Sequence, residues 1–200
     1  GKAVYEDEYN GGTGSNGLTS ARHDLYSSYL AEKYPESYNT QIPTELVYTG
    51  SRRVDEIDEE TGMTFGKLLL SPTRTYAPVV KEMVEKHRNE IHGIIHCSGG
   101  AQTKVLNFIE DLTVIKDNLF PVPPLFRHLQ KESGTSWMEM YKVFNMGHRM
   151  ELYVNKDIAA NLIAISEKFG VEARVIGKVI KSNGTKVILK TVHGEYSYEK

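Results

Sequence analysis

The chain has 200 residues, of which 40% are hydrophobic and 25% are charged, and its formal net charge at pH 7 is −2. This length fits one domain, or at most two small ones, and suffices to bury a substantial core. The near-neutral charge, with lysine and arginine spread along the chain, argues against a nucleic-acid partner. No apolar run approaches the roughly 18 residues that span a bilayer, so we expect no membrane partner.

The cysteine and histidine content bears on location and metal binding. Cys97 is the single cysteine, so the chain cannot form an internal disulfide, which fits a reducing compartment. The N-terminal residues show no basic region followed by an apolar segment. No pair among the seven histidines has the spacing of a metalloprotease site. We expect a cytoplasmic protein with no metal site in this chain.

Four glycines stand among the seven residues of GGTGSNG at positions 11–17, directly before a helical pattern. Glycine adopts positive φ without steric cost and lets an anion approach main-chain N–H groups closely. A flexible chain end has the same composition. The residues alone leave both interpretations of this Gly-rich loop (1–17) open.

The first half of the chain predicts a helix, a strand and an acidic loop. Apolar residues three to four apart predict an amphipathic helix over 18–34, ended by Pro35. Residues 46–49 predict a short strand. Residues 50–66 form an acidic surface insertion, with its carboxylates within 52–60, and we expect a solvated hairpin or loop there rather than a magnesium site.

The second half alternates helices and strands. The expected helices lie at 79–89, within 98–110, 121–134 and 136–144, and at 156–170; the expected strands lie at 91–97, 112–117 and 149–154, with a final pair from 172–180 and 185–190 around a Ser-Asn-Gly turn. The pattern predicts an α+β or α/β fold with helices layered on a mixed sheet.

Five segments together resemble a known enzyme family. They are SNGL (15–18), LLLSPTRTY (68–76), IIHCSGG (94–100), PVPPLF (121–126) and EMYKVFNMGHRM (139–150). In this order and at these intervals they look like the C-terminal half of phosphoribosylformylglycinamidine cyclo-ligase, also called aminoimidazole ribonucleotide synthetase. The resemblance covers most of the chain. It implies a three-layer α/β/α arrangement with a mixed sheet covered by helices.

The resemblance also implies a reaction. ATP activates the formamide oxygen of formylglycinamidine ribonucleotide, the amidine nitrogen attacks the activated carbon, and ADP and phosphate are released as the imidazole ring of 5-aminoimidazole ribonucleotide forms. Residues 1–200 would then be a single C-terminal domain whose N-terminal partner domain, which mainly binds ATP and Mg²⁺, is absent. We expect the fragment alone to be inactive and the full-length protein to be a homodimer.

By the same resemblance, two glycine segments face phosphate. One contains Gly14, Ser15, Asn16 and Gly17, although a tight turn and helix cap remains an alternative, and Gly14 stands where the family has a histidine. The other contains Ser98, Gly99 and Gly100, with Ser98 in place of the family's threonine and Ala101 in place of a third glycine.

His96 is the candidate catalytic residue, because it precedes the second glycine segment at an expected strand end. A structural, hydrogen-bonded histidine is the alternative. Thr73 and Arg74 are candidate phosphate ligands, and the arginine could equally cap a helix. Asn145 is either a turn residue or a ligand contact. His148 and Arg149, which follow Gly147, depart from a more apolar family pattern, and we expect them to add positive charge to a cleft if they reach it.

Two other function classes stay open. A non-catalytic module that binds phosphate or nucleotide, or that provides a subunit interface, would lack the aspartate-rich motif of the family's N-terminal half in its reading frame. Another ATP-dependent enzyme of the same superfamily would differ in substrate preference rather than in fold.

Overall fold

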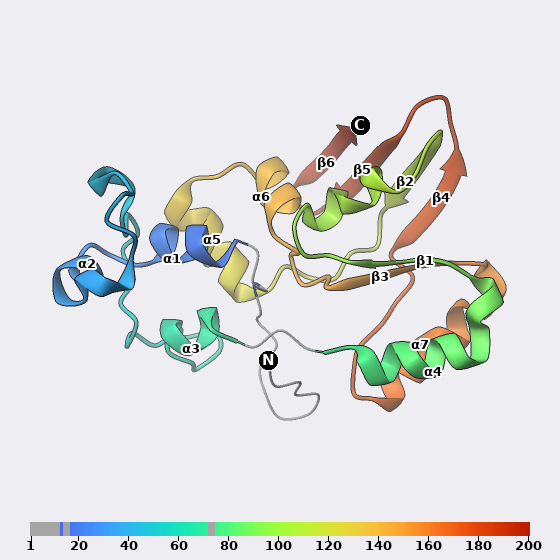
Figure 1. The fold of residues 1–200 in the computed structure, drawn as a ribbon, viewed down its shortest axis with the longest axis horizontal. Helices are drawn as coiled ribbons and strands as arrows, with labels where there is room; N and C mark the ends of the chain where they lie inside the picture. The colour runs from blue at the N-terminus through green and yellow to red at the C-terminus, as the bar shows by residue number, and fades with distance from the viewer. Residues whose placement is uncertain (1–12, 14–16, 72–74) are drawn as a thin grey trace.

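The computed structural model describes residues 13, 17–71 and 75–200, and it has a mixed α+β fold. The helices within residues 18–69 gather at one end of the molecule together with α5 (Pro124–Ser133), and two β-sheets lie at the other end (Figure 1). The predicted α+β class is therefore confirmed. Among the described residues, no helix is long and apolar enough to cross a membrane.

The N-terminal part is helical. Its elements are α1 (Leu18–Leu25), α2 (Tyr29–Lys33), η1 (Pro35–Ser37), η2 (Thr44–Leu46) and α3 (Phe65–Leu69). The single helix expected over 18–34 is divided in two, because Tyr26 takes an extended conformation and forms a parallel bridge with Arg52. The prediction of a strand at 46–49 is wrong, because these residues form no strand. Tyr48 has a φ of 52° and its N–H donates to His23 Nδ1 at 3.2 Å, a geometry that no regular ladder accommodates.

The central part follows the predicted order. Its elements are α4 (Ala77–His87), η3 (Arg88–Glu90), β1 (Ile91–His96), η4 (Ala101–Asn107) and β2 (Leu112–Lys116). The helix expected after the glycine turn is present in 3₁₀ form. Thr103 contributes to this form, because its backbone N–H and its hydroxyl both donate to the Gly100 carbonyl, at 2.8 and 2.9 Å.

The C-terminal part contains α5 (Pro124–Ser133), α6 (Trp137–Val143), β3 (Met150–Val154), η5 (Lys156–Ile158), α7 (Ala159–Lys168), β4 (Gly177–Lys181), β5 (Lys186–Thr191) and β6 (Gly194–Glu199). Proline at the start of α5 and Gly134 in the left-handed region at its end match the expected helix signals. The terminal strand β6 is an element that the sequence pattern did not predict.

The strands form two sheets. β1 pairs with β3 in an antiparallel ladder that places His96 opposite Met150. The second sheet has the order β4-β2-β5-β6, in which β2 and β5 are parallel and the other pairs are antiparallel. The expected pairing of the two strands around Ser182-Asn183-Gly184 is therefore wrong. β2 lies between them, because it bonds β4 on one side and β5 on the other.

Two apolar clusters hold these layers together. The larger one joins α1, α3, α5 and α6 to buried residues of β2 and β5, with Leu125, Phe126 and Met140 fully buried. The smaller one packs α4, η5 and α7 against the β1–β3 ladder through Val79, Met83, Ile158, Leu162 and Ile165. Figure 1 shows α4 and α7 side by side next to that ladder. Burial of these apolar stripes is the main source of stability for such layers.

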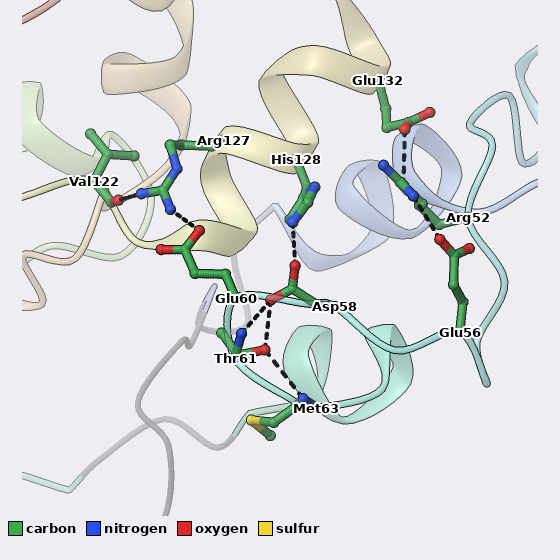
Figure 2. A network of polar contacts seen from close by, with 10 residues as sticks. All are labelled: Arg52, Glu56, Asp58, Glu60, Thr61, Met63, Val122, Arg127, His128 and Glu132. Carbon is green, nitrogen blue, oxygen red and sulfur yellow. Dashed lines mark hydrogen bonds and ion pairs between the residues drawn. The ribbon is translucent and has the colours of Figure 1, made fainter.

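The acidic loop is attached to α5 instead of extending into solvent (Figure 2). Asp58 is only 4% exposed and contacts His128, whereas Glu60 pairs with Arg127 at the helix surface. Arg52 pairs with both Glu56 and Glu132, at 2.6 and 3.2 Å. The expectation of a solvated segment therefore fails for Asp58.

Candidate functional site

A tight glycine turn follows β1 and carries the predicted residues Ser98, Gly99 and Gly100. The Ser98 N–H donates to the His96 carbonyl and the Ala101 N–H donates to the Ser98 carbonyl, both at 2.8 Å. Gly100 has a φ of 82°, which favours glycine, and Ala101 also has a positive φ, of 39°. Within the described part of the chain, the Gly99 and Gly100 amides donate to no backbone carbonyl. They are suited to an anion that approaches the turn.

His96 lies at the end of β1 with its imidazole exposed. Partial desolvation by the surrounding chain lowers its pKa below the ordinary value of 6.5, although the residue is exposed, and the charges of Lys104 and Arg149 lower it further. A neutral imidazole can accept a proton near pH 7. The geometry is therefore compatible with the acid–base contact expected for His96.

Lys104 is the residue at this turn that sequence reasoning missed. Its ammonium donates to the Ser98 hydroxyl at 2.8 Å and to the His96 carbonyl at 3.0 Å. It thereby brings a positive charge directly to the glycine turn. A lysine that follows Gly100 at a distance of four residues was the available signal, because one turn of a helix returns it to the same side.

Asn145 is buried at a corner between α6 and β3. Its side-chain oxygen accepts from the Gly147 N–H at 2.9 Å, and its Nδ2 donates to the Thr13 carbonyl at 3.3 Å. Its own carbonyl accepts from Gln102 Nε2 at 2.9 Å. Asn145 thus connects Thr13, through its side chain, with Gln102 of η4, through its carbonyl.

Gly17 lies next to the same corner. It has a φ of 80°, and a Cβ placed on it would come within 2.7 Å of the Phe144 ring. The requirement for glycine at this position is therefore backbone geometry and close packing. The other residues of that segment, Gly14, Ser15 and Asn16, lie outside the described residues, as do Thr73 and Arg74.

A groove of about 1190 Å³ lies beside β3, between α7 and the segment that leads into β4. His148 and Arg149 both line it. Burial lowers the pKa of His148 to about 4, so this side chain is neutral at pH 7 and adds no positive charge. Of the two residues expected to bring charge to a cleft, Arg149 alone does so.

Cys97, which lies between His96 and Ser98 in the chain, is buried. Burial raises the pKa of its thiol well above the ordinary value, and the nearby Glu151 carboxylate raises it further. The thiol therefore stays protonated and is a poor nucleophile, in agreement with a buried structural cysteine. No three His, Cys, Asp or Glu side chains of the described ranges converge to hold a metal ion.

The sequence comparisons define the class of this protein. Residues 45–190 match the family described as AIR synthase related protein, C-terminal domain. The chain belongs to this family, which confirms the resemblance carried by the five segments.

Its relatives include phosphoribosylformylglycinamidine cyclo-ligases. The one from Methanocaldococcus jannaschii is 34% identical over 134 residues, which cover 66% of this chain and 38% of that protein. Those from Methanococcus vannielii and Clostridium novyi are 30% and 36% identical, with 84% and 66% of this chain and 41% and 40% of those proteins covered. The chain thus spans about two fifths of each relative.

Among solved structures, a crystal structure of E. coli HypE is similar over 94% of this chain and 48% of that one. The TM-score is 0.47 at 13% identity.

Proposed function

We propose that this chain is the C-terminal part of an ATP-dependent cyclo-ligase that closes formylglycinamidine ribonucleotide to 5-aminoimidazole ribonucleotide. The observation that carries the proposal is the glycine turn at Ser98–Gly100, where amides, a hydroxyl and the Lys104 ammonium converge inside the span that matches the family. Family members named for this reaction support it.

The proposed reaction forms one P–O bond and one C–N bond. The γ-phosphoryl group of ATP passes to the formamide oxygen and ADP leaves. The amidine nitrogen then attacks the activated carbon, the C–O bond to the phosphoryl group breaks, and phosphate departs with loss of a proton from nitrogen. Such chemistry depends on positioning and on charge stabilisation more than on a protein nucleophile.

The residues of the turn fit the phosphate side of this reaction. Lys104 supplies charge, Ser98 supplies a hydroxyl, and the Gly99 and Gly100 amides supply neutral donors. His96 would accept the proton that the nitrogen loses, which is supported by its exposed position at the end of β1 next to the turn and by a lowered pKa that favours the neutral imidazole. Asn145 positions the corner beside Thr13. ATP and Mg²⁺ would bind mainly through the partner domain that the family carries N-terminal to this one.

We also propose a homodimeric full-length enzyme in the cytoplasm. The reducing compartment is supported by the buried, unpaired Cys97. A phosphate-binding module without catalysis is the second candidate, because the donors of the turn could hold phosphate without turnover, whereas the names of the relatives favour the enzyme. The two differ in turnover alone.

The test is an assay of the protein encoded by the complete reading frame. It should convert formylglycinamidine ribonucleotide and ATP to 5-aminoimidazole ribonucleotide, ADP and phosphate. His96→Gln should lower kcat at least tenfold, whereas His92→Gln, at the other end of β1, should leave it unchanged. Wild-type protein that binds phosphate at residues 98–100 but shows no turnover would favour the binding module.

A further inference from the structure

Lys116 is a buried ammonium at the end of β2. It is 1% exposed, yet its Nζ has three acceptors: the Gln102 carbonyl at 2.7 Å, the Gln102 side-chain oxygen at 3.1 Å and the Glu151 carboxylate. An ammonium has three protons, so this lysine is fully satisfied. Its contacts join β2 to both η4 and β3.

Gln102 extends the hydrogen-bond network from Lys116 to Asn145. Its side chain is fully buried, accepts from Lys116 through Oε1 and donates through Nε2 to the Asn145 carbonyl at 2.9 Å. Asn145 in turn holds the Gly147 amide and the Thr13 carbonyl. A continuous chain of hydrogen bonds therefore runs from β2 to the N-terminal segment.

Glu151 closes the other end of the network. One carboxylate oxygen accepts from Lys116 and the other accepts from the Tyr153 hydroxyl at 2.7 Å. A buried ion pair stabilises a fold little more than apolar residues of the same shape would, because desolvation offsets the attraction. What such a pair supplies here is a defined geometry. Apolar contacts alone would not fix the orientation of Gln102.

The glycine turn depends on that orientation. Gln102 is two residues beyond Gly100 and directly follows Ala101, whose positive φ places the chain in a sparsely populated conformation. The Lys116 ammonium binds the backbone carbonyl of Gln102 itself, so it fixes the main chain at the exit of the turn.

We propose that Lys116 is a positioning residue that holds the Ser98–Gly100 turn and the Asn145 corner in a fixed relation to each other. The inference rests on the proposed function in so far as these two segments form the phosphate side of the site. Lys116 is buried, so its proposed role involves no contact with substrate or phosphate. It acts through Gln102.

The test replaces the ion pair by neutral side chains of similar size. Lys116→Met combined with Glu151→Gln avoids an unpaired buried charge and keeps an acceptor for Tyr153. The control is Lys81→Met combined with Glu85→Gln, which makes the same two changes in an exposed pair on α4. Both proteins are compared with wild type by amide NMR, by thermal unfolding and by titration with inorganic phosphate.

The expected result is movement of the amide signals of Gly99, Gly100, Ala101 and Gly147 in the buried double variant, with at least tenfold weaker phosphate binding. The control should show neither change. A folded double variant with wild-type signals at these positions and unchanged phosphate affinity would overturn the proposal, and so would a lower melting temperature as its sole effect.

Failure of the proposed function has a different signature. Wild-type protein that shows no phosphate binding at 98–100 argues against the phosphate site, whereas the amide signals of the unliganded variants still decide whether Lys116 positions the turn. If the double variant does not fold, Gln102→Met decides. It keeps Lys116 paired with Glu151, and it should move the Gly147 amide signal; an unmoved signal would contradict the coupling.

Discussion

Asp58 and His128 are joined by a contact of 2.7 Å between the carboxylate Oδ1 and the imidazole Nε2, although 70 residues separate them in the chain. The second oxygen of Asp58 accepts from the Thr61 amide and hydroxyl, at 2.9 and 2.6 Å (Figure 2). One carboxylate therefore both closes the tip of the acidic loop and attaches it to α5.

Replacement of Asp58 by Asn should lower the free energy of unfolding by about 1–3 kcal/mol at pH 7, because a buried carboxylate with several hydrogen bonds loses its charge. Burial raises the pKa of Asp58, but the hydrogen bonds from Thr61 and His128 outweigh it and hold the pKa below the ordinary 3.8. The stabilisation is thus complete above that value and is lost as the pH falls through the lower pKa of the folded state.

Urea denaturation of wild type and Asp58→Asn between pH 7 and pH 3 measures this effect. The difference between the two proteins should narrow in the most acidic samples. Glu60→Gln is the matched control, since that carboxylate is 58% exposed in its pair with Arg127 and should matter little. Equal effects of the two substitutions at pH 7 would contradict the role given to Asp58.

Gly17 and Gly184 both require glycine for backbone conformation, but only Gly17 also requires it for close packing. Both have similar positive φ values, 80° and 85°, but a Cβ on Gly17 would lie 2.7 Å from the Phe144 ring, whereas a Cβ on Gly184 meets nothing within 4 Å. Gly184→Ala should cost about 1–2 kcal/mol of stability from backbone strain. Gly17→Ala should cost about 1–3 kcal/mol more, because overpacking is added. Thermal unfolding of the two variants compares them directly, and equal losses would remove Phe144 from the explanation.

The elements that the sequence predicts well are those whose periodicity is local. The apolar stripe of α4 and the β-branched run of β1 both correspond to surfaces that pack against a neighbouring layer. The insertion of β2 between β4 and β5 could not be predicted in this way. A Ser-Asn-Gly turn favours a hairpin, but strand order depends on which partner buries more apolar surface, and that partner lies about 70 residues earlier in the chain.

The candidate site also contains residues that local sequence predicts and residues that only the fold reveals. The strand followed by a glycine turn identifies His96 and Ser98–Gly100 from sequence, because the backbone requirement is local. The role of Lys116 could not be predicted from local sequence, since a lysine at the end of a strand is typically solvated. One signal was present: alternation along LTVIK places Lys116 on the same face as Val114, which is buried. Its partners Gln102 and Glu151 become visible once the fold is known.

Lys104→Met should weaken phosphate binding about tenfold, because one charge-assisted contact at the turn is lost. It should also raise the pKa of His96 toward 6.5, since burial is the larger cause of the depressed pKa and the Lys104 charge is the next. An NMR titration of the His96 ring protons reports the pKa, and a phosphate titration reports the affinity. Lys131→Met, on the exposed face of α5, is the control. An unchanged His96 pKa in Lys104→Met would place the ammonium elsewhere in solution.

The burial of His148 predicts that the protein loses stability in acid. Its Nε2 accepts from the Phe120 N–H at 3.0 Å, and burial lowers its pKa from 6.5 to about 4. Between these two values the unfolded chain binds a proton that the folded protein does not, so stability falls as the pH is lowered from 6.5 to 4. The integrated loss is about 3 kcal/mol, at roughly 1.4 kcal/mol per pKa unit.

His148→Gln should remove this part of the pH dependence, because glutamine can accept from the Phe120 N–H without titrating. Urea denaturation at pH 7, 6, 5 and 4 should give a flatter stability profile for the variant than for wild type, even if the variant is less stable at pH 7. His92→Gln changes an exposed imidazole that contacts Asn155 and should leave the wild-type slope intact. Parallel profiles for wild type and His148→Gln would mean that the imidazole keeps the same pKa in the folded and unfolded protein, and that below about pH 6.5 it adds a positive charge to the groove that Arg149 also lines.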